Sequence, residues 1–85
     1  MAETKSESTV TLPFSVANEL LEFKVRSIRN EIESILSKWD QSSVEVFQSK
    51  TRSGEIPEAE TDAIIVGNLV DSLQQYEKLI QGIRG

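Results

Sequence analysis

The sequence predicts an all-α protein, an antiparallel hairpin of two long helices with a short connector helix between them. Two observations predict this fold class. Two runs of apolar residues show the alternating spacing of three and four that marks helices packed side by side. A polar segment with helix-capping and turn residues separates the runs. We expect one helical domain over residues 13–85, with helices at about 14–39, 43–52 and 57–83.

The first long helix is the clearest element. Its apolar run is spaced 4, 3, 4, 3, 4 and consists of Leu21, Val25, Ile28, Ile32, Ile35 and Trp39. Pro13 suits the first turn, because the N–H that proline lacks would have no partner there. Residues 1–12 are mostly small, polar or charged and predict a flexible tail, in which TVTL at 9–12 has the alternation of a short strand.

The connector helix is predicted from its ends. Ser42 followed by Glu45 fits a capping box, in which each side chain accepts a hydrogen bond from the other residue's backbone N–H. Val44 and Phe47 are three residues apart and would share the inner face of this helix. Gly54 is suited to end it in the left-handed conformation.

The second long helix follows a second start signal. Pro57 suits its first position, and Glu58, Glu60 and Asp62 place negative charge at the positive end of the helix dipole. Its apolar run is spaced 3, 4, 3, 4, 3 and consists of Val66, Leu69, Leu73, Tyr76, Ile80 and Ile83. We expect the two runs to pair antiparallel, with the connector helix closing one end of the hairpin.

Composition removes several function classes. The 85 residues include no cysteine and no histidine, so disulfides, thiolate nucleophiles and imidazole-based sites are excluded. We therefore expect no enzyme, no cofactor and no metal site. A domain this small has a marginal core unless disulfides, a metal or association adds to it, and association is the supplement left.

The overall charge also limits the partners. A formal net charge of −5 repels phosphate backbones and makes nucleic acid an unexpected partner. No apolar run approaches the length of a membrane span, and the N-terminus has no hydrophobic signal segment. We expect a soluble, cytoplasmic protein that does not bind membranes.

The first helix has a second apolar side. Val16, Leu20 and Phe23 lie roughly opposite the first apolar run, and antiparallel pairing would bring Leu79 and Ile83 close to them at the open end of the hairpin. Further apolar residues would widen the two runs: Leu36, Ile65, Val70 and Leu79. We expect the five residues at the open end to bind a partner protein or a second copy in a four-helix bundle. The alternative is that the TVTL segment folds back over them.

Other candidate sites have simpler structural interpretations. The acidic residues near Pro57 lack the ligand spacing of a calcium-binding loop. Lys24, Arg26 and Arg29 are interleaved with glutamates and are typical of a solvated helix face. Trp39 and Tyr76 occupy positions in the apolar runs and are expected in the core.

A nucleic-acid-binding regulator is the alternative hypothesis. TVTLP followed by a helix is similar to the start of ribbon-helix-helix repressors, whose paired strands enter the major groove. The first helix is about twice too long for that fold, and the strand lacks basic residues. Binding through such a ribbon would weaken steeply as salt rises, whereas apolar association would not.

About half of the chain resembles a group of small helical proteins of archaea and cyanobacteria. The resemblance rests on Trp39, the Ser43–Phe47 spacing, Gly54-Glu55-Ile56 and Asp62. The group has a long helix ending in an aromatic residue, a connector helix, an acidic turn and a second long helix. Gln41 stands where the group has glycine, and Pro57 follows the turn. Some members are similar to antitoxins, so the resemblance implies a hairpin fold and an antitoxin-like role.

The sequence therefore favours a non-enzymatic interaction module that self-associates or clasps a partner protein through the start of the first helix. Shielding a partner, as an antitoxin does, is its most concrete version. A structural subunit of a larger helical assembly is a third hypothesis.

Overall fold

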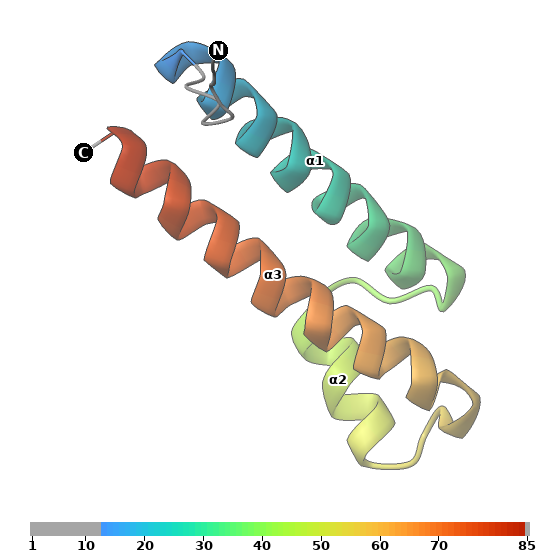
Figure 1. The fold of residues 1–85 in the computed structure, drawn as a ribbon. Helices are drawn as coiled ribbons and strands as arrows, with labels where there is room; N and C mark the ends of the chain where they lie inside the picture. The colour runs from blue at the N-terminus through green and yellow to red at the C-terminus, as the bar shows by residue number, and fades with distance from the viewer. Residues whose placement is uncertain (1–12, 85) are drawn as a thin grey trace, which may run out of the picture.

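The computed structural model describes residues 13–84 as an all-helical chain, which confirms the predicted fold class (Figure 1). Helix α1 spans Phe14–Lys38, α2 spans Val44–Arg52, the 3-10 turn η1 spans Pro57–Ala59, and α3 spans Glu60–Arg84. The described residues contain no strand. The predicted tail, its possible strand at 9–12 and the ribbon hypothesis lie outside the described residues.

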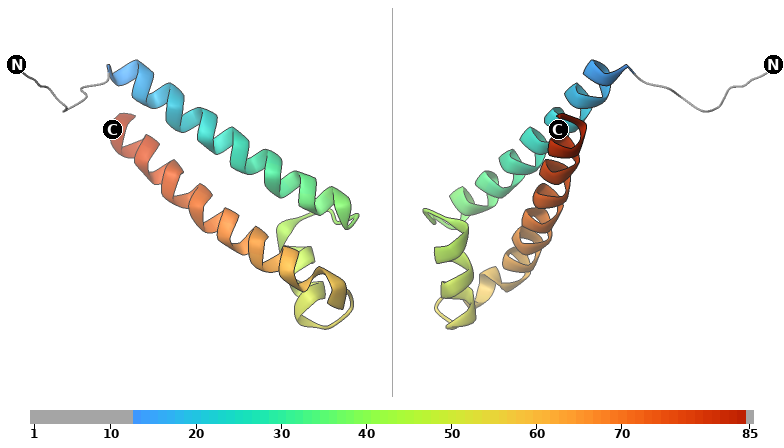
Figure 2. Two further views of the ribbon diagram at one scale, coloured as in Figure 1. Left: turned by 45° about the vertical axis from the view of Figure 1, so that its right-hand side comes forward. Right: turned by 90° about the vertical axis from the view of Figure 1, so that its left-hand side faces the viewer.

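Helices α1 and α3 run antiparallel and side by side for most of their length (Figures 1 and 2). Each has 25 residues, which corresponds to a rod of about 37 Å. Helix α2 lies at one end of the pair and packs against both long helices. The start of α1 and the end of α3 lie at the other end, which we call the open end. The end with α2 is called the connector end.

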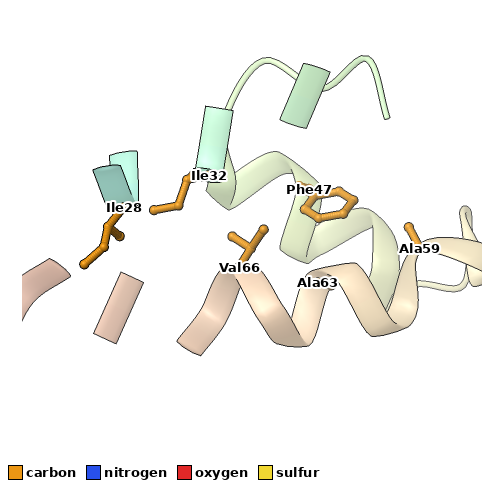
Figure 3. Close-up of a cluster of buried hydrophobic side chains, with 6 residues drawn as sticks. All are labelled: Ile28, Ile32, Phe47, Ala59, Ala63 and Val66. Carbon is orange, nitrogen blue, oxygen red and sulfur yellow. The ribbon is translucent and has the colours of Figure 1, made fainter. Parts of the chain in front are cut away.

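The core is concentrated at the connector end (Figure 3). Phe47 of α2 and Val66 of α3 are completely buried. Ala59, the last residue of η1, and Ala63 of α3 are four residues apart, and their small side chains leave room for the Phe47 ring. Six buried residues form this cluster: Ile28, Ile32, Phe47, Ala59, Ala63 and Val66.

The two apolar runs form the contact between α1 and α3. Their most buried members are Val25, Ile28, Ile32, Val66 and Ile80. Trp39 and Tyr76 are partly buried against the core cluster, as expected. Of the residues predicted to widen the runs, Leu36 and Val70 pack on the core, but Ile65 and Leu79 are largely exposed. Ile65 and Leu79 thus lie on the flank of α3 rather than under α1, and they widen the apolar run on the surface instead of in the core.

The start of α2 lies one residue later than the capping box predicted. The cap is Ser43, whose Oγ accepts a hydrogen bond from the backbone N–H of Val46 at 3.2 Å. The third helical residue is thus a valine, which cannot return the hydrogen bond as a glutamate would. Two adjacent serines gave the sequence two candidate caps, and the backbone of Ser43, which is extended, selects the second.

The two prolines also take slightly different places. Pro13 is the cap residue before α1, and its carbonyl accepts the first two helical hydrogen bonds, from Val16 and Ala17. Pro57 begins a 3-10 turn rather than the α-helix itself. This tighter turn leads directly into α3 and carries Ala59 into the core.

Two closing turns set the ends of α1 and α2. Gly54 ends α2 with φ +84°, as predicted, and the N–H groups of Gly54 and Glu55 donate to carbonyls of the last helical turn. Helix α1 ends in the same way, but Asp40 occupies the left-handed position with φ +55°. The N–H groups of Asp40 and Gln41 complete that turn. Both connections leave their helix sharply enough for α2 to fold back against the pair.

Candidate interaction surface at the open end

Three apolar side chains of α1 face away from the hairpin. Val16, Leu20 and Phe23, which we call the outer stripe, are 37%, 57% and 64% exposed. Their spacing of four and three places them on successive turns of one helix face. Val25 and Ile28, on the face towards α3, are buried. The structure thus leaves the second apolar side of α1 uncovered by α2 and α3.

An ion pair defines the two flanks of the hairpin. Arg29 and Glu77 bridge α1 and α3 on one flank. At about 100° per residue, Arg29 lies to one side of buried Ile28, and the outer stripe lies to the other side. On α3, Glu77 lies to one side of buried Ile80, and Leu79 lies to the other. Leu79 and the outer stripe therefore share the flank opposite the ion pair.

The five predicted partner-binding residues thus divide into two groups. The outer stripe and Leu79 are exposed towards the same flank near the open end, and Leu79 is 54% exposed. Ile83 is half-buried. Its register in the second apolar run places it in the contact with α1 rather than on the surface.

Sequence reasoning missed a fourth exposed side chain of α1. Phe14 is 60% exposed although it lies seven residues before Leu21, on the face that α1 turns towards α3. Since Arg29 lies opposite Glu77 and the helices are antiparallel, Phe14 extends beyond the level at which α3 ends. The seven-residue spacing between Phe14 and Leu21 is the sequence signal that places Phe14 in line with the first apolar run.

A second exposed apolar group lies at the connector end. Ile64 is 64% exposed, and Val46 and Ile65 are about as exposed as Val16. Ile64 lines a shallow hollow with Thr51 and Arg52 of α2. Its position, two residues before Val66, directs it away from α1. This group provides a control surface for experiments on the outer stripe.

Charged side chains border the outer stripe on both sides. Glu19, Lys24, Arg26 and Glu31 are all exposed. Glu19 and Arg26 line a shallow hollow on α1 together with Leu20 and Phe23. Within residues 13–84, none of these four charged side chains forms an ion pair. The outer stripe is thus an apolar strip between unpaired charges of both signs.

A polar cluster at the connector end has a structural role. The Asp62 carboxylate accepts hydrogen bonds from Lys38 Nζ at 2.9 Å and from Trp39 Nε1 at 2.8 Å. The hydrogen bond from Lys38, followed by that from Trp39, lowers the pKa of Asp62 below its usual value. Lys38 Nζ also lies 5.4 Å from the centre of the Trp39 ring. These contacts tie the end of α1 to the start of α3.

The described residues offer no group of three or more side chains arranged to hold a metal ion. A cleft of about 380 Å³ between α1 and α3 is lined by Glu22, Val25, Arg29, Glu77, Ile80 and Gln81. Its cation, Arg29, is already paired with Glu77. The cleft therefore contains the ion pair that joins α1 to α3.

Asn18, near the open end, makes only part of the hydrogen bonds that its side-chain amide can form. Its Nδ2 donates to Glu22 at 3.3 Å, whereas its Oδ1 is buried without a hydrogen-bond partner. Asn18 lies at the point where the first apolar run, extended towards the N-terminus, calls for an apolar residue. The buried acceptor without a partner therefore makes the packing of α1 less favourable here than at the connector end.

No family model matches the chain, and neither a curated protein nor a solved structure matches it. Across residues 13–84, each helix is too short or too polar to cross a bilayer.

Proposed function

We propose that the chain is a protein–protein interaction module that binds through the outer stripe. The observation that carries the proposal is the exposure of Val16, Leu20 and Phe23 on three successive turns of α1, on the face opposite α3. Fully burying a Val, Leu or Phe side chain contributes roughly 1.5–3 kcal/mol each. Such a gain is large beside the stability of a small domain.

The arrangement of the helices supports binding to another protein rather than catalysis. The outer stripe lies on a continuous helix, and its flanks carry charges that have no partner within residues 13–84. A helix with an apolar strip and charged borders is the usual form in which one protein presents a helix to another. Leu79 extends the apolar surface on the same flank.

An antitoxin-like role is the most concrete version of this function. In that role the outer stripe would cover an apolar surface of a partner protein in the cytoplasm. The resemblance of about half of the chain to the archaeal and cyanobacterial hairpin proteins supports this version, and the acidic charge of the chain is compatible with it.

Site-specific photo-crosslinking in the source organism tests the proposal. A crosslinking amino acid replaces Phe23 in one variant and Gln75, an exposed residue of α3, in a control variant. We expect a protein adduct from position 23 and none from position 75. The absence of an adduct at position 23, with normal expression of the variant, would contradict an interaction role for the outer stripe.

A further inference from the structure

The outer face of α1 carries a complete second heptad seam. The outer stripe continues with Ser27, Asn30 and Ser34, so the six positions from 16 to 34 are spaced 4, 3, 4, 3, 4. Their first half is apolar and their second half has small or amide side chains. Small side chains in a seam allow two helix backbones to approach closely, and amides can hydrogen-bond to each other. This is the pattern of a helix that pairs along its length.

The charges beside this seam match a second copy of the same helix. Glu19 and Arg26 lie on one border, and Lys24 and Glu31 lie on the other. In a parallel pair of helices, a residue on one border faces the residue five positions later on the opposite border of the other helix. Glu19 then faces Lys24 of the second copy, and Arg26 faces Glu31 of the second copy. Two-fold symmetry makes four opposite-charge pairs and no like-charge pair.

We propose that the occupant of the outer stripe is a second copy of this chain, with the two α1 helices parallel and in register. The proposal rests on the proposed function and names its partner. The dimer is a four-helix arrangement in which the α1 helices form the centre and each α3 lies on the outside. Phe23 meets Phe23 of the second copy, and Leu20 meets Leu20 of the second copy.

The hairpin leaves room for this pairing. Helix α3 packs against the face of α1 that carries Val25, Ile28 and Ile32. The seam from residue 16 to residue 34 lies on roughly the opposite face. A second copy can thus approach α1 without touching α3.

The charges favour the parallel arrangement over the antiparallel one. In an antiparallel pair centred on the outer stripe, borders of the same kind face each other. Glu19 then faces Arg26 of the second copy, which gives two opposite-charge pairs, and Lys24 faces the uncharged Ala17. The small residues Ser27, Asn30 and Ser34 also meet their own counterparts only in the parallel dimer.

Sedimentation of the full chain tests the dimer. With three apolar residues from each copy, we expect micromolar affinity, so the mass should rise from one chain to two between about 2 and 500 µM. Phe23→Asp should remain a monomer throughout this range. Ile64→Asp is the matched control, because Ile64 and Phe23 are both 64% exposed, and it should dimerise like the wild type. A monomeric wild type, or a Phe23→Asp variant that dimerises normally, would overturn the proposal.

Charge exchange tests the parallel register without altering the apolar residues. Glu19→Lys should raise the dimer dissociation constant about tenfold or more, because two attractive pairs become repulsive. Adding Lys24→Glu should restore the wild-type constant. The control pair Glu19→Arg with Arg26→Glu should remain weakened, because it creates like-charge pairs with Lys24 and Glu31. The reverse result, in which only the control pair restores dimerisation, would refute the parallel arrangement.

The two proposals fail in different ways. A monomeric wild type whose position 23 crosslinks to another protein would overturn the dimer and support the interaction module. A monomeric wild type without any adduct from position 23 would overturn both.

Discussion

The two ends of the hairpin use the same heptad pattern but reach different degrees of packing. At the connector end α2 adds a third layer, and Phe47 and Val66 are completely buried. At the open end only α1 and α3 meet, Asn18 lacks a hydrogen-bond partner for its Oδ1, and the outer stripe is exposed. The comparison teaches that two paired helices bury one face each. A helix with two apolar faces needs a third element, and residues 13–84 supply it at one end only.

Two phenylalanines give the largest expected contrast between the ends. Phe47→Ala should lower the free energy of unfolding by about 3–5 kcal/mol, because it empties the centre of the core. Phe23→Ala, measured by urea unfolding at a concentration where the chain is monomeric, should change it by less than about 0.5 kcal/mol. Phe47→Leu should give an intermediate loss if Phe47→Ala does not fold. Equal changes in the free energy of unfolding for the two alanine variants would contradict the difference in packing between the two ends.

The next effect concerns the weak packing at the open end. Asn18→Leu should raise the free energy of unfolding by about 1 kcal/mol, because it removes a buried acceptor without a partner and extends the apolar run. Asn68→Leu, at an exposed site on α3, serves as the control and should be nearly neutral. Destabilisation by Asn18→Leu would show that the amide makes a contact on which the open end depends.

A smaller effect is expected where α1 ends near the connector. Asp40 has φ +55°, so Asp40→Gly should stabilise the chain by about 0.5–1 kcal/mol by relieving the left-handed conformation and removing a negative charge from the helix C-terminus. Asp40→Ala removes the same charge but keeps the strain, so it should be less stable than Asp40→Gly. Thermal unfolding of both variants provides the measurement, and an Asp40→Ala variant as stable as Asp40→Gly would refute the assignment of strain.

The pH dependence of the connector end gives the finest test. The pKa of Asp62 is lowered from 3.8, so its ionised form stabilises the fold above that value, and the contribution is lost as the pH falls through the lower folded value. Asp62→Asn should abolish this dependence. The difference in urea midpoint between wild type and Asp62→Asn should be constant near neutral pH and shrink below about pH 3.8. A difference that grows on acidification would contradict the sign of the pKa shift.

Much of the fold could be predicted from the sequence, because the apolar runs have the period of the helices that they form. The role of Gly54 could also be predicted from the local sequence, since glycine is the usual residue at a left-handed helix end. The left-handed conformation of Asp40 could not be predicted in this way, because its positive φ follows from the need to redirect the chain into α2. Likewise, the choice between Ser42 and Ser43 as cap depends on how α2 meets the core.

The candidate site was only partly predictable for a similar reason. The spacing of Val16, Leu20 and Phe23 placed them on one face, but their exposure depends on where α3 lies. Ile83 was assigned to the surface although its register places it in the seam. Phe14 was missed because only the level at which α3 ends exposes it, and Ile64 was missed although its position two residues before Val66 directs it away from α1.

Fluorine NMR of the chain labelled with 4-fluorophenylalanine tests the central claim most directly, because the three phenylalanines occupy three environments: buried Phe47, overhanging Phe14 and outer-stripe Phe23. The solvent isotope shift between H₂O and D₂O reports the exposure of each ring. We expect Phe23 to show this shift in dilute samples and to lose it as the concentration rises through the dimer dissociation constant, while Phe47 never shows it. A Phe23 ring that stays solvent-exposed at every concentration would contradict the claim that a second copy covers the outer stripe.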